Sequence, residues 1–140
     1  MIKGKIITDN NEIKEILKNS KKIAVLGISP KKERDSFQVS KFLIENGYEI
    51  FPVRPGGGEI HGLKVYENLD SLDEKIDILD VFRNSDKVLG HLEEALRLKP
   101  KVFWMQLGVE NQEAAKVLIE NGINVIMDRC TKIEHKRLFS

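Results

Sequence analysis

The sequence is poor in cysteine and has no long apolar run. Its single cysteine, Cys130, excludes an internal disulfide framework and a zinc site built from several cysteines. No apolar stretch approaches the roughly 20 residues that a transmembrane helix needs. Residues 1–5 also lack the apolar segment of a secretory signal peptide. We therefore expect a cytoplasmic protein that has no membrane partner.

A surplus of charge of one sign is also lacking, because 23 lysine and arginine residues stand against 22 acidic ones. A net charge of +1 gives no global field for nucleic acid, so we expect no nucleic-acid partner. Hydrophobic residues make up 41% of the chain, which suffices for a core and excludes a disordered protein. At roughly 100–200 residues per domain, the length predicts one domain over residues 1–140.

Apolar segments alternate along the chain with segments of helical periodicity. Residues 22–29 read KIAVLGIS, a run typical of a strand buried on both faces. Similar runs predict four more strands, at residues 48–53, 77–82, 102–107 and 123–127. Pro52 indicates that the second strand ends there or lies at an edge of the sheet. Capping residues and apolar spacing predict helices at residues 10–18, from Asp35 or Ser36 to Asn46, at 72–75, from Ser85 to Pro100, at 110–120 and at 131–138.

This alternation predicts an α/β fold, a doubly wound five-stranded parallel sheet with helices on both faces. Ligands of such sheets bind beyond the carboxyl ends of the strands, where the strand order reverses. In the common order third, second, first, fourth and fifth strand, that point lies between the first and fourth strands. The turns 27–29 and 106–108 are therefore the candidate site, with Arg54 and Arg83 as neighbours.

The turn after the first strand does not match the familiar nucleotide motifs. It has one glycine, Gly27, where a dinucleotide fingerprint needs three, and the chain has no P-loop motif. It is rich instead in groups that suit a phosphate at a helix start, namely Ser29, Lys31, Lys32, Arg34 and Ser36. The alternative interpretation is a solvated loop in which Ser36 or Asp35 caps the helix.

The end of the second strand reads Val53-Arg54-Pro55. NAD sites usually carry an acidic residue there, which accepts hydrogen bonds from the ribose hydroxyls. A cation at this place favours a phosphorylated ribose, as in NADP or coenzyme A (CoA). The alternative is that Arg54 is an ordinary surface arginine.

Several motifs together resemble a known family. They are G-x-S-x-x-x-x-R-x-S from Gly27 to Ser36, GYEIFPVRP at 47–55, G-x-x-V-Y-x-x-L from Gly62 to Leu69, DVFR at 80–83, VFWMQLGV at 102–109 and MDRC at 127–130. In their order and spacing, over about residues 20–138, the chain resembles the small CoA-binding proteins that are similar to the N-terminal domain of the succinyl-CoA synthetase α subunit. The resemblance implies a Rossmann-like sheet with CoA bound across the point of strand reversal.

The resemblance also implies roles for individual residues. Ser29, Arg34 and Ser36 are expected to hold phosphates, and residues 53–55 the nucleotide portion. Residues 82–83 and 106–108 are expected to flank the rest of CoA. Where the family often has Pro-Val-Asn-Pro, this chain has Pro-Val-Arg-Pro at 52–55, which replaces an asparagine contact by a possible phosphate contact. The predicted cofactor-binding residues are Gly27, Ile28, Ser29, Lys32, Arg34, Ser36, Val53, Arg54, Pro55, Phe82, Arg83, Gln106 and Gly108.

Other polar residues allow both functional and structural interpretations. Cys130 is either a packed thiol or a redox thiol able to form a mixed disulfide with CoA. The three histidines lack the spacing of a metal site, and Ser29 has no visible triad partners, so we predict neither metal nor catalytic residues. We expect Phe103 and Trp104 in the core and caps or loop bonds for Asp77 and Asp80. We expect Asp128 to pair with Arg129.

Three functions remain open at this point. The first is the binding of CoA or acyl-CoA, a small-molecule ligand, without catalysis. The second is an NADP-dependent oxidoreductase, which Arg54 favours and the missing glycines disfavour. The third is a regulatory protein that signals the presence of CoA to a protein partner of unknown identity.

Overall fold

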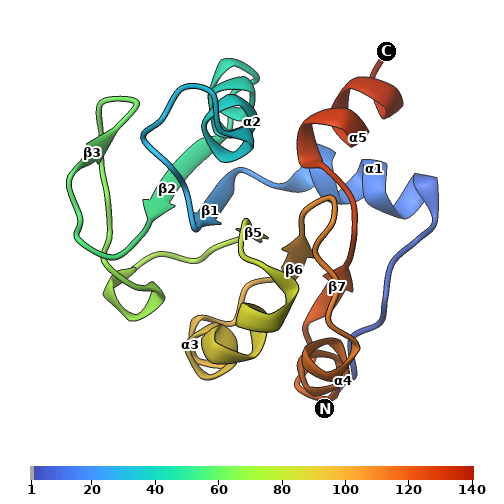
Figure 1. Cartoon of the computed structure of the whole chain (residues 1–140). Helices are drawn as coiled ribbons and strands as arrows, with labels where there is room; N and C mark the ends of the chain where they lie inside the picture. The colour runs from blue at the N-terminus through green and yellow to red at the C-terminus, as the bar shows by residue number, and fades with distance from the viewer. Residues whose placement is uncertain (1) are drawn as a thin grey trace.

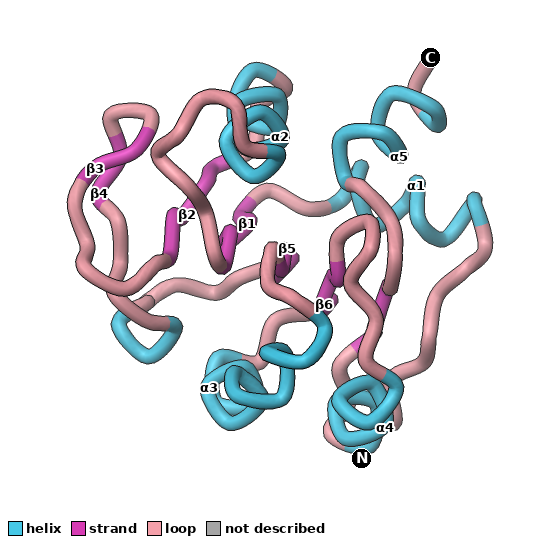
Figure 2. The backbone as a smooth tube through the Cα atoms, viewed as in Figure 1, coloured by secondary structure: helices cyan, strands magenta, loops and turns pink. Residues whose placement is uncertain are grey.

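A computed structural model describes residues 2–140, and Met1, the first residue of the predicted domain, lies outside the described residues. A five-stranded sheet forms the centre of the structure, with every pairing parallel. Its strands are β1 (Lys22–Leu26), β2 (Glu49–Val53), β5 (Ile78–Val81), β6 (Val102–Met105) and β7 (Asn124–Ile126). Each predicted strand is present, although most end earlier at the carboxyl side than the apolar runs do. The predicted α/β class is therefore confirmed (Figures 1 and 2).

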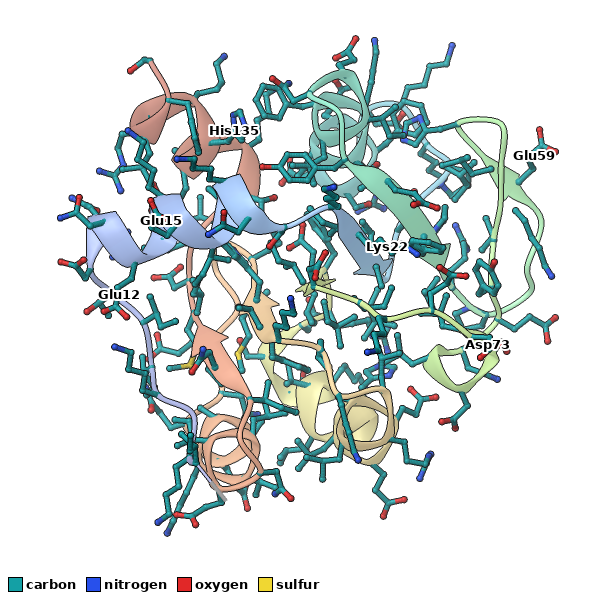
Figure 3. The ribbon with its side chains drawn as sticks, turned by 180° about the vertical axis from the view of Figure 1, so that it is seen from behind. Glu12, Glu15, Lys22, Glu59, Asp73 and His135 are labelled. Carbon is teal, nitrogen blue, oxygen red and sulfur yellow. The ribbon has the colours of Figure 1, made fainter. Side chains whose placement is uncertain are left out.

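Helices cover both faces of this sheet, as predicted. One face carries α1 (Asn10–Asn19), α2 (Asp35–Glu45) and α5 (Thr131–Leu138), and the other carries α3 (Leu92–Leu98) and α4 (Gln112–Glu120) (Figure 1). Seen from behind, α1 crosses the sheet beside α5, and Glu59 marks a hairpin beyond the opposite edge (Figure 3). That hairpin consists of β3 (Glu59–Ile60) and β4 (Leu63–Lys64).

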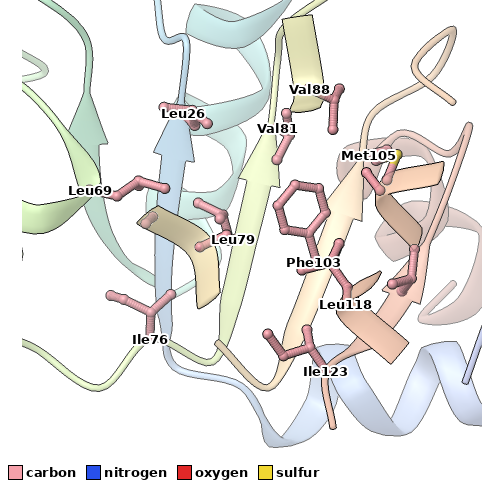
Figure 4. Close-up of a cluster of buried hydrophobic side chains, with 14 of the residues drawn as sticks. Leu26, Leu69, Ile76, Leu79, Val81, Val88, Phe103, Met105, Leu118 and Ile123 are labelled. Atoms are coloured by element: carbon pink, nitrogen blue, oxygen red, sulfur yellow. The ribbon is translucent and has the colours of Figure 1, made fainter. Parts of the chain in front are cut away.

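Two hydrophobic clusters result, one on each face of the sheet. The cluster under α3 and α4 includes Leu79, Phe103 and Leu118, all fully buried (Figure 4). The cluster under α1, α2 and α5 includes Trp104, whose indole Nε1 donates a hydrogen bond of 2.7 Å to the carbonyl of Arg129. Both predicted core aromatics are thus confirmed. Because the strands are buried on both faces, their sequences read as continuous apolar runs.

The strand order differs from the expected one. The sheet runs β2-β1-β5-β6-β7, so the third strand of the predicted series pairs with the first, and the second forms an edge. The order therefore reverses between β1 and β5, not between the first and fourth strands. Pro52 lies within β2, which is an edge strand. This confirms the prediction of an edge position for Pro52 and not the alternative that the strand ends there.

Several local predictions were wrong. No helix forms at 72–75. A 3₁₀ turn, Leu69–Ser71, instead lies just before this segment and is capped by Asn68. The segment after Ser85 begins as a 3₁₀ helix, Ser85–His91, and its N-cap is Asn84. Helix α4 starts at Gln112 because the Asn111 side chain caps it, which leaves residues 110–111 outside. Neither Asp35 nor Ser36 caps α2, whose N-cap is Arg34 and has no side-chain bond.

In the part of the chain that the structure describes, no helix has both the length and the apolar character needed to cross a membrane.

Candidate functional site

The turn after β1 brings three strand ends together. Gly27 has a φ of +84°, a conformation that favours glycine, and a Cβ there would lie 2.4 Å from the carbonyl oxygen of Phe82. The Gly27 amide donates a 3.0 Å hydrogen bond to the carbonyl of Val53. The ends of β1, β2 and β5 thus meet at Gly27. Any larger residue at this position would displace the neighbouring backbone.

The segment from this turn to α2 is held by its own serines. The Ser36 hydroxyl accepts a 2.9 Å hydrogen bond from the Ser29 amide, and the Ser29 hydroxyl accepts one of 3.1 Å from the Lys31 amide. Ser36 is buried, and its hydroxyl bonds the amide of Ser29 in the loop and not an amide of the helix start, so it stabilises the loop and does not cap the helix. Both serines therefore shape the backbone of the predicted phosphate turn.

Two cavities form one groove along the carboxyl edge of the sheet. A cavity of about 400 Å³ lies over the ends of β1 and β2, and one of about 550 Å³ lies over β5, β6 and the start of α5. Arg34 and Arg83 line both cavities, which are therefore adjacent. The groove crosses the observed point of strand reversal between β1 and β5.

The six arginines of the chain divide into two groups of three. Those outside the groove form ion pairs with carboxylates, and they are Arg97, Arg129 and Arg137. Those in the groove form no ion pair within residues 2–140, and they are Arg34, Arg54 and Arg83. The Nε of Arg83 is buried without a hydrogen-bond partner among the described residues. Three uncompensated guanidinium groups and one orphaned donor fit a ligand with several phosphates.

The larger cavity has several apolar side chains in its lining, beside the charged Lys132 of α5. Phe82, Val109, Leu107 and Ile133 line it together with Cys130, the half-buried N-cap residue of α5. Burial raises the pKa of the Cys130 thiol, so at neutral pH the thiol is protonated. This part of the groove suits an uncharged, mostly apolar portion of a ligand.

A buried polar network supports the wall of this cavity. The Asp80 carboxylate accepts hydrogen bonds from the Gln106 amide and, at 3.1 Å, from the Thr131 hydroxyl. The Gln106 Nε2 also donates to the Thr131 hydroxyl at 3.0 Å, so both of its donors are used inside the protein. Gln106 lines the cavity, and its amide oxygen accepts no hydrogen bond from residues 2–140. Complete burial raises the pKa of Asp80 to about 7.

Most of the predicted site residues line this groove. Around the smaller cavity lie Gly27, Ile28, Ser29, Arg34, Arg54, Pro55 and Arg83. Around the larger cavity lie Arg34, Ser36, Phe82, Arg83 and Gln106. Three predicted residues line neither: Lys32 is exposed, Val53 is buried in β2, and Gly108 donates its amide to Asp128. Their predicted contacts with a ligand remain predictions.

The sequence did not indicate several lining residues. Asn84, Val109, Lys132 and Ile133 belong to the larger cavity. Asn84 directly follows Phe82 and Arg83, which were predicted to flank CoA. A predicted segment that was one residue longer would have included it. Lys132 and Ile133 come from α5, whose approach to the turn after β6 depends on long-range packing that no local pattern shows.

The other polar residues have structural partners. Asp77 accepts hydrogen bonds from the amides of Lys21 and Lys22, as expected of a loop-bonding residue. Arg129 pairs with Glu134 and not with Asp128, so that prediction was wrong. The expected cap or loop bond of Asp80 was wrong, because Asp80 lies completely buried within β5 and bonds the side chains of Gln106 and Thr131. No cluster of potential metal ligands is present within residues 2–140.

Comparisons with known proteins bear on this groove. The chain is 48% identical over 124 residues to the protein YneT of Bacillus subtilis, covering 92% of that protein. It is 32% identical over 120 residues to acetate–CoA ligase (ADP-forming) I subunit alpha of Pyrococcus furiosus, of which it covers 26%. The structure of cell-free ID.343 from Thermus thermophilus superposes with a TM-score of 0.91 at 41% identity, over 94% of this chain and 100% of that one.

The family comparison agrees with the resemblance that the motifs suggested. The CoA binding domain family matches residues 21–136, which include all the described strands of the main sheet and the whole groove. The match begins just before β1 and ends within α5. The chain therefore belongs to the CoA binding domain family.

Proposed function

We propose that this protein binds CoA, free or acylated, in the groove at the carboxyl edge of its sheet and performs no catalysis of its own. The observation that carries the proposal is the set of three arginines without carboxylate partners, Arg34, Arg54 and Arg83, along one groove. CoA carries a diphosphate and a ribose phosphate, and guanidinium groups bind phosphates bidentately. Membership of the family supports the choice of CoA over other phosphorylated ligands.

The two cavities differ in chemistry, and this difference orients the ligand. Arg54 and Lys31 belong to the smaller cavity, which we assign to the ribose phosphate and the diphosphate. Phe82 and Val109 belong to the larger cavity, which we assign to the pantetheine arm. We assign to the free amide oxygen of Gln106, a residue that lines the larger cavity, a hydrogen bond from an amide or thiol of that arm.

The absence of catalysis is proposed from the groups that line the groove. The three histidines line neither cavity, and the Cys130 thiol has its pKa raised by burial, which makes it a poor nucleophile at neutral pH. The chain corresponds to about a quarter of the ligase subunit that it resembles, 26% of its length. Incubation of this chain with CoA, ATP, magnesium and small carboxylic acids should therefore yield no acyl-CoA.

A thermal-shift panel tests the proposal against the NADP alternative. CoA at about 100 times its dissociation constant should raise the unfolding free energy by roughly 2.7 kcal/mol, or the melting temperature by roughly 8 °C. NAD and NADP at the same concentration should shift it little, because the turn after β1 lacks the glycines of a dinucleotide site. A larger shift with NADP than with CoA would overturn the proposal.

A further inference from the structure

A third cavity, of about 460 Å³, continues the groove past the ends of β6 and β7. It shares Leu107, Cys130 and Ile133 with the cavity that we assign to the pantetheine arm. Its far wall includes Ile6, Ile7 and Met127. The amide of Ile7 donates a 2.8 Å hydrogen bond to the carbonyl of Val125 in β7, which fixes this N-terminal segment beside the sheet.

Exposed apolar side chains gather at this cavity. Six large hydrophobic residues of the described chain are exposed, and three of them, Ile6, Leu107 and Ile133, line it. Leu107 and Ile133 are 62% and 52% exposed and stand where the two cavities meet. Exposed apolar groups concentrated at one cavity indicate an apolar ligand or partner, whereas scattered ones need no explanation.

The charged side chains around the third cavity have the opposite sign to those of the groove. Glu110, Asp128 and Glu134 line it, with Arg129 as the one cation in that lining. Glu134 is already paired with both Arg129 and Arg137, whereas Glu110 and Asp128 form no ion pair within residues 2–140, so these two carboxylates make up the acidic surplus. This acidic surplus repels phosphates and carboxylates, so the phosphate end of a ligand lies at the arginines and the far end must be uncharged.

We propose that the third cavity holds the aliphatic, uncharged acyl chain of an acyl-CoA, whose thioester lies at the junction lined by Leu107, Cys130 and Ile133. This inference rests on the proposed function, since it needs the pantetheine arm in the neighbouring cavity. It specifies the ligand as a monocarboxylic acyl-CoA and not free CoA or a dicarboxylic acyl-CoA.

The state of Cys130 is compatible with an intact thioester at the junction. Burial raises the pKa of the thiol, and the thiolate is the form that attacks thioesters. We therefore expect bound acyl-CoA to stay unreacted. After incubation with acyl-CoA and subsequent denaturation, the protein should have the same mass as before.

Calorimetric titrations with CoA and with acetyl-, butyryl-, hexanoyl- and succinyl-CoA test the inference. Complete burial of a methylene corresponds to about fourfold tighter binding, and this open cavity should give about twofold per carbon. Because hexanoyl has four more carbons than acetyl, hexanoyl-CoA should thus bind roughly sixteenfold more tightly than acetyl-CoA. Succinyl-CoA should bind more weakly than butyryl-CoA, because its carboxylate meets the acidic lining.

Two variants and a control locate the chain-length preference. Ile6→Ser changes the far wall and Leu107→Ser the junction, and both should reduce the hexanoyl-to-acetyl preference to about twofold or less. Ile6 lies outside the proposed CoA groove, so Ile6→Ser should leave the affinity for free CoA unchanged. The matched control is Leu89→Ser, a change at another exposed leucine, 38% exposed, that lines none of the three cavities.

The possible outcomes separate this inference from the proposed function. Binding of CoA with equal affinity for acetyl- and hexanoyl-CoA overturns the acyl site and leaves the CoA site intact. Preferential binding of succinyl-CoA, or a length preference that both variants retain, also overturns it. Failure of every ligand to bind contradicts the proposed function itself.

Discussion

Arg54 directly follows the edge strand β2, at the place where nucleotide-binding sheets carry the residue that contacts the ribose. It lines the smaller cavity, is partly buried and donates a long, 3.5 Å hydrogen bond to the carbonyl of Ile28. We predict that it binds the ribose 3′-phosphate of CoA. Arg54→Ala should weaken CoA by roughly 10–150-fold, the value of a hydrogen bond to a charged group, and leave dephospho-CoA nearly unchanged.

A calorimetric cycle that removes the guanidinium and the 3′-phosphate in turn measures this coupling directly. Arg97→Ala is the matched control, because Arg97 pairs with Asp70 away from the groove. A coupling energy near zero would assign the phosphate to another cation and return Arg54 to the ordinary surface.

Asp80 predicts a pH dependence of stability. Its pKa is about 7 in the folded protein against 3.8 for a free aspartate, so the folded state holds a proton that the unfolded state releases between pH 4 and pH 7. As the pH rises from about 4 to about 7, the free energy of unfolding should therefore fall by up to about 4 kcal/mol. An asparagine has the same shape and can bond both Gln106 and Thr131 without a charge.

Urea unfolding of wild-type protein and Asp80→Asn at several pH values checks this sign. The variant should match the wild type near pH 4 and become more stable than it by pH 7–8. Groups such as His61 and His135, whose pKa values are lowered by burial, titrate in both proteins and cancel in the difference. A difference that does not change with pH would show that Asp80 is already ionised at low pH.

Among the elements, the junction of β1 with β5 depends on one glycine. Gly27 and Gly47 both have a positive φ, +84° and +91°, but a Cβ at Gly47 meets no atom within 4 Å. Gly47→Ala should therefore cost about 1–2 kcal/mol for the left-handed conformation alone. Gly27→Ala should cost a further 1–3 kcal/mol or so, because its methyl group overlaps the Phe82 carbonyl.

Thermal unfolding of the two variants measures this difference, and CoA titration should show weaker binding in Gly27→Ala alone. Equal destabilisation by the two substitutions would mean that the turn after β1 moves freely, contrary to the close packing of the strand ends.

Local pattern was sufficient to locate the five strands of the main sheet and insufficient for their order. Continuous apolar runs marked all five strands, because parallel strands covered on both faces contain little else. The order of the sheet depends on which runs pair, and the pairing of β1 with β5 joins residues about 55 apart, such as Ile23 with Ile78. The β3–β4 hairpin has two residues in each strand, too few to show any alternation.

For the molecule as a whole, the sequence located the charged half of the site better than the apolar half. Arg34, Arg54 and Arg83 stand at strand ends or a helix start, positions that local pattern can identify. The network of Asp80, Gln106 and Thr131 unites three distant segments, and the third cavity needs the N-terminal segment against β7. Such features arise from packing between elements, which one sequence does not reveal.

The central claim is that one CoA binds across the arginine-lined groove of each chain. The most direct measurement is a calorimetric titration of the wild-type protein with CoA at low and moderate ionic strength. We predict a stoichiometry of one CoA per chain and an affinity that falls as salt screens the phosphate contacts. The absence of saturable binding at either ionic strength, or tighter binding of NADP than of CoA, would contradict the account.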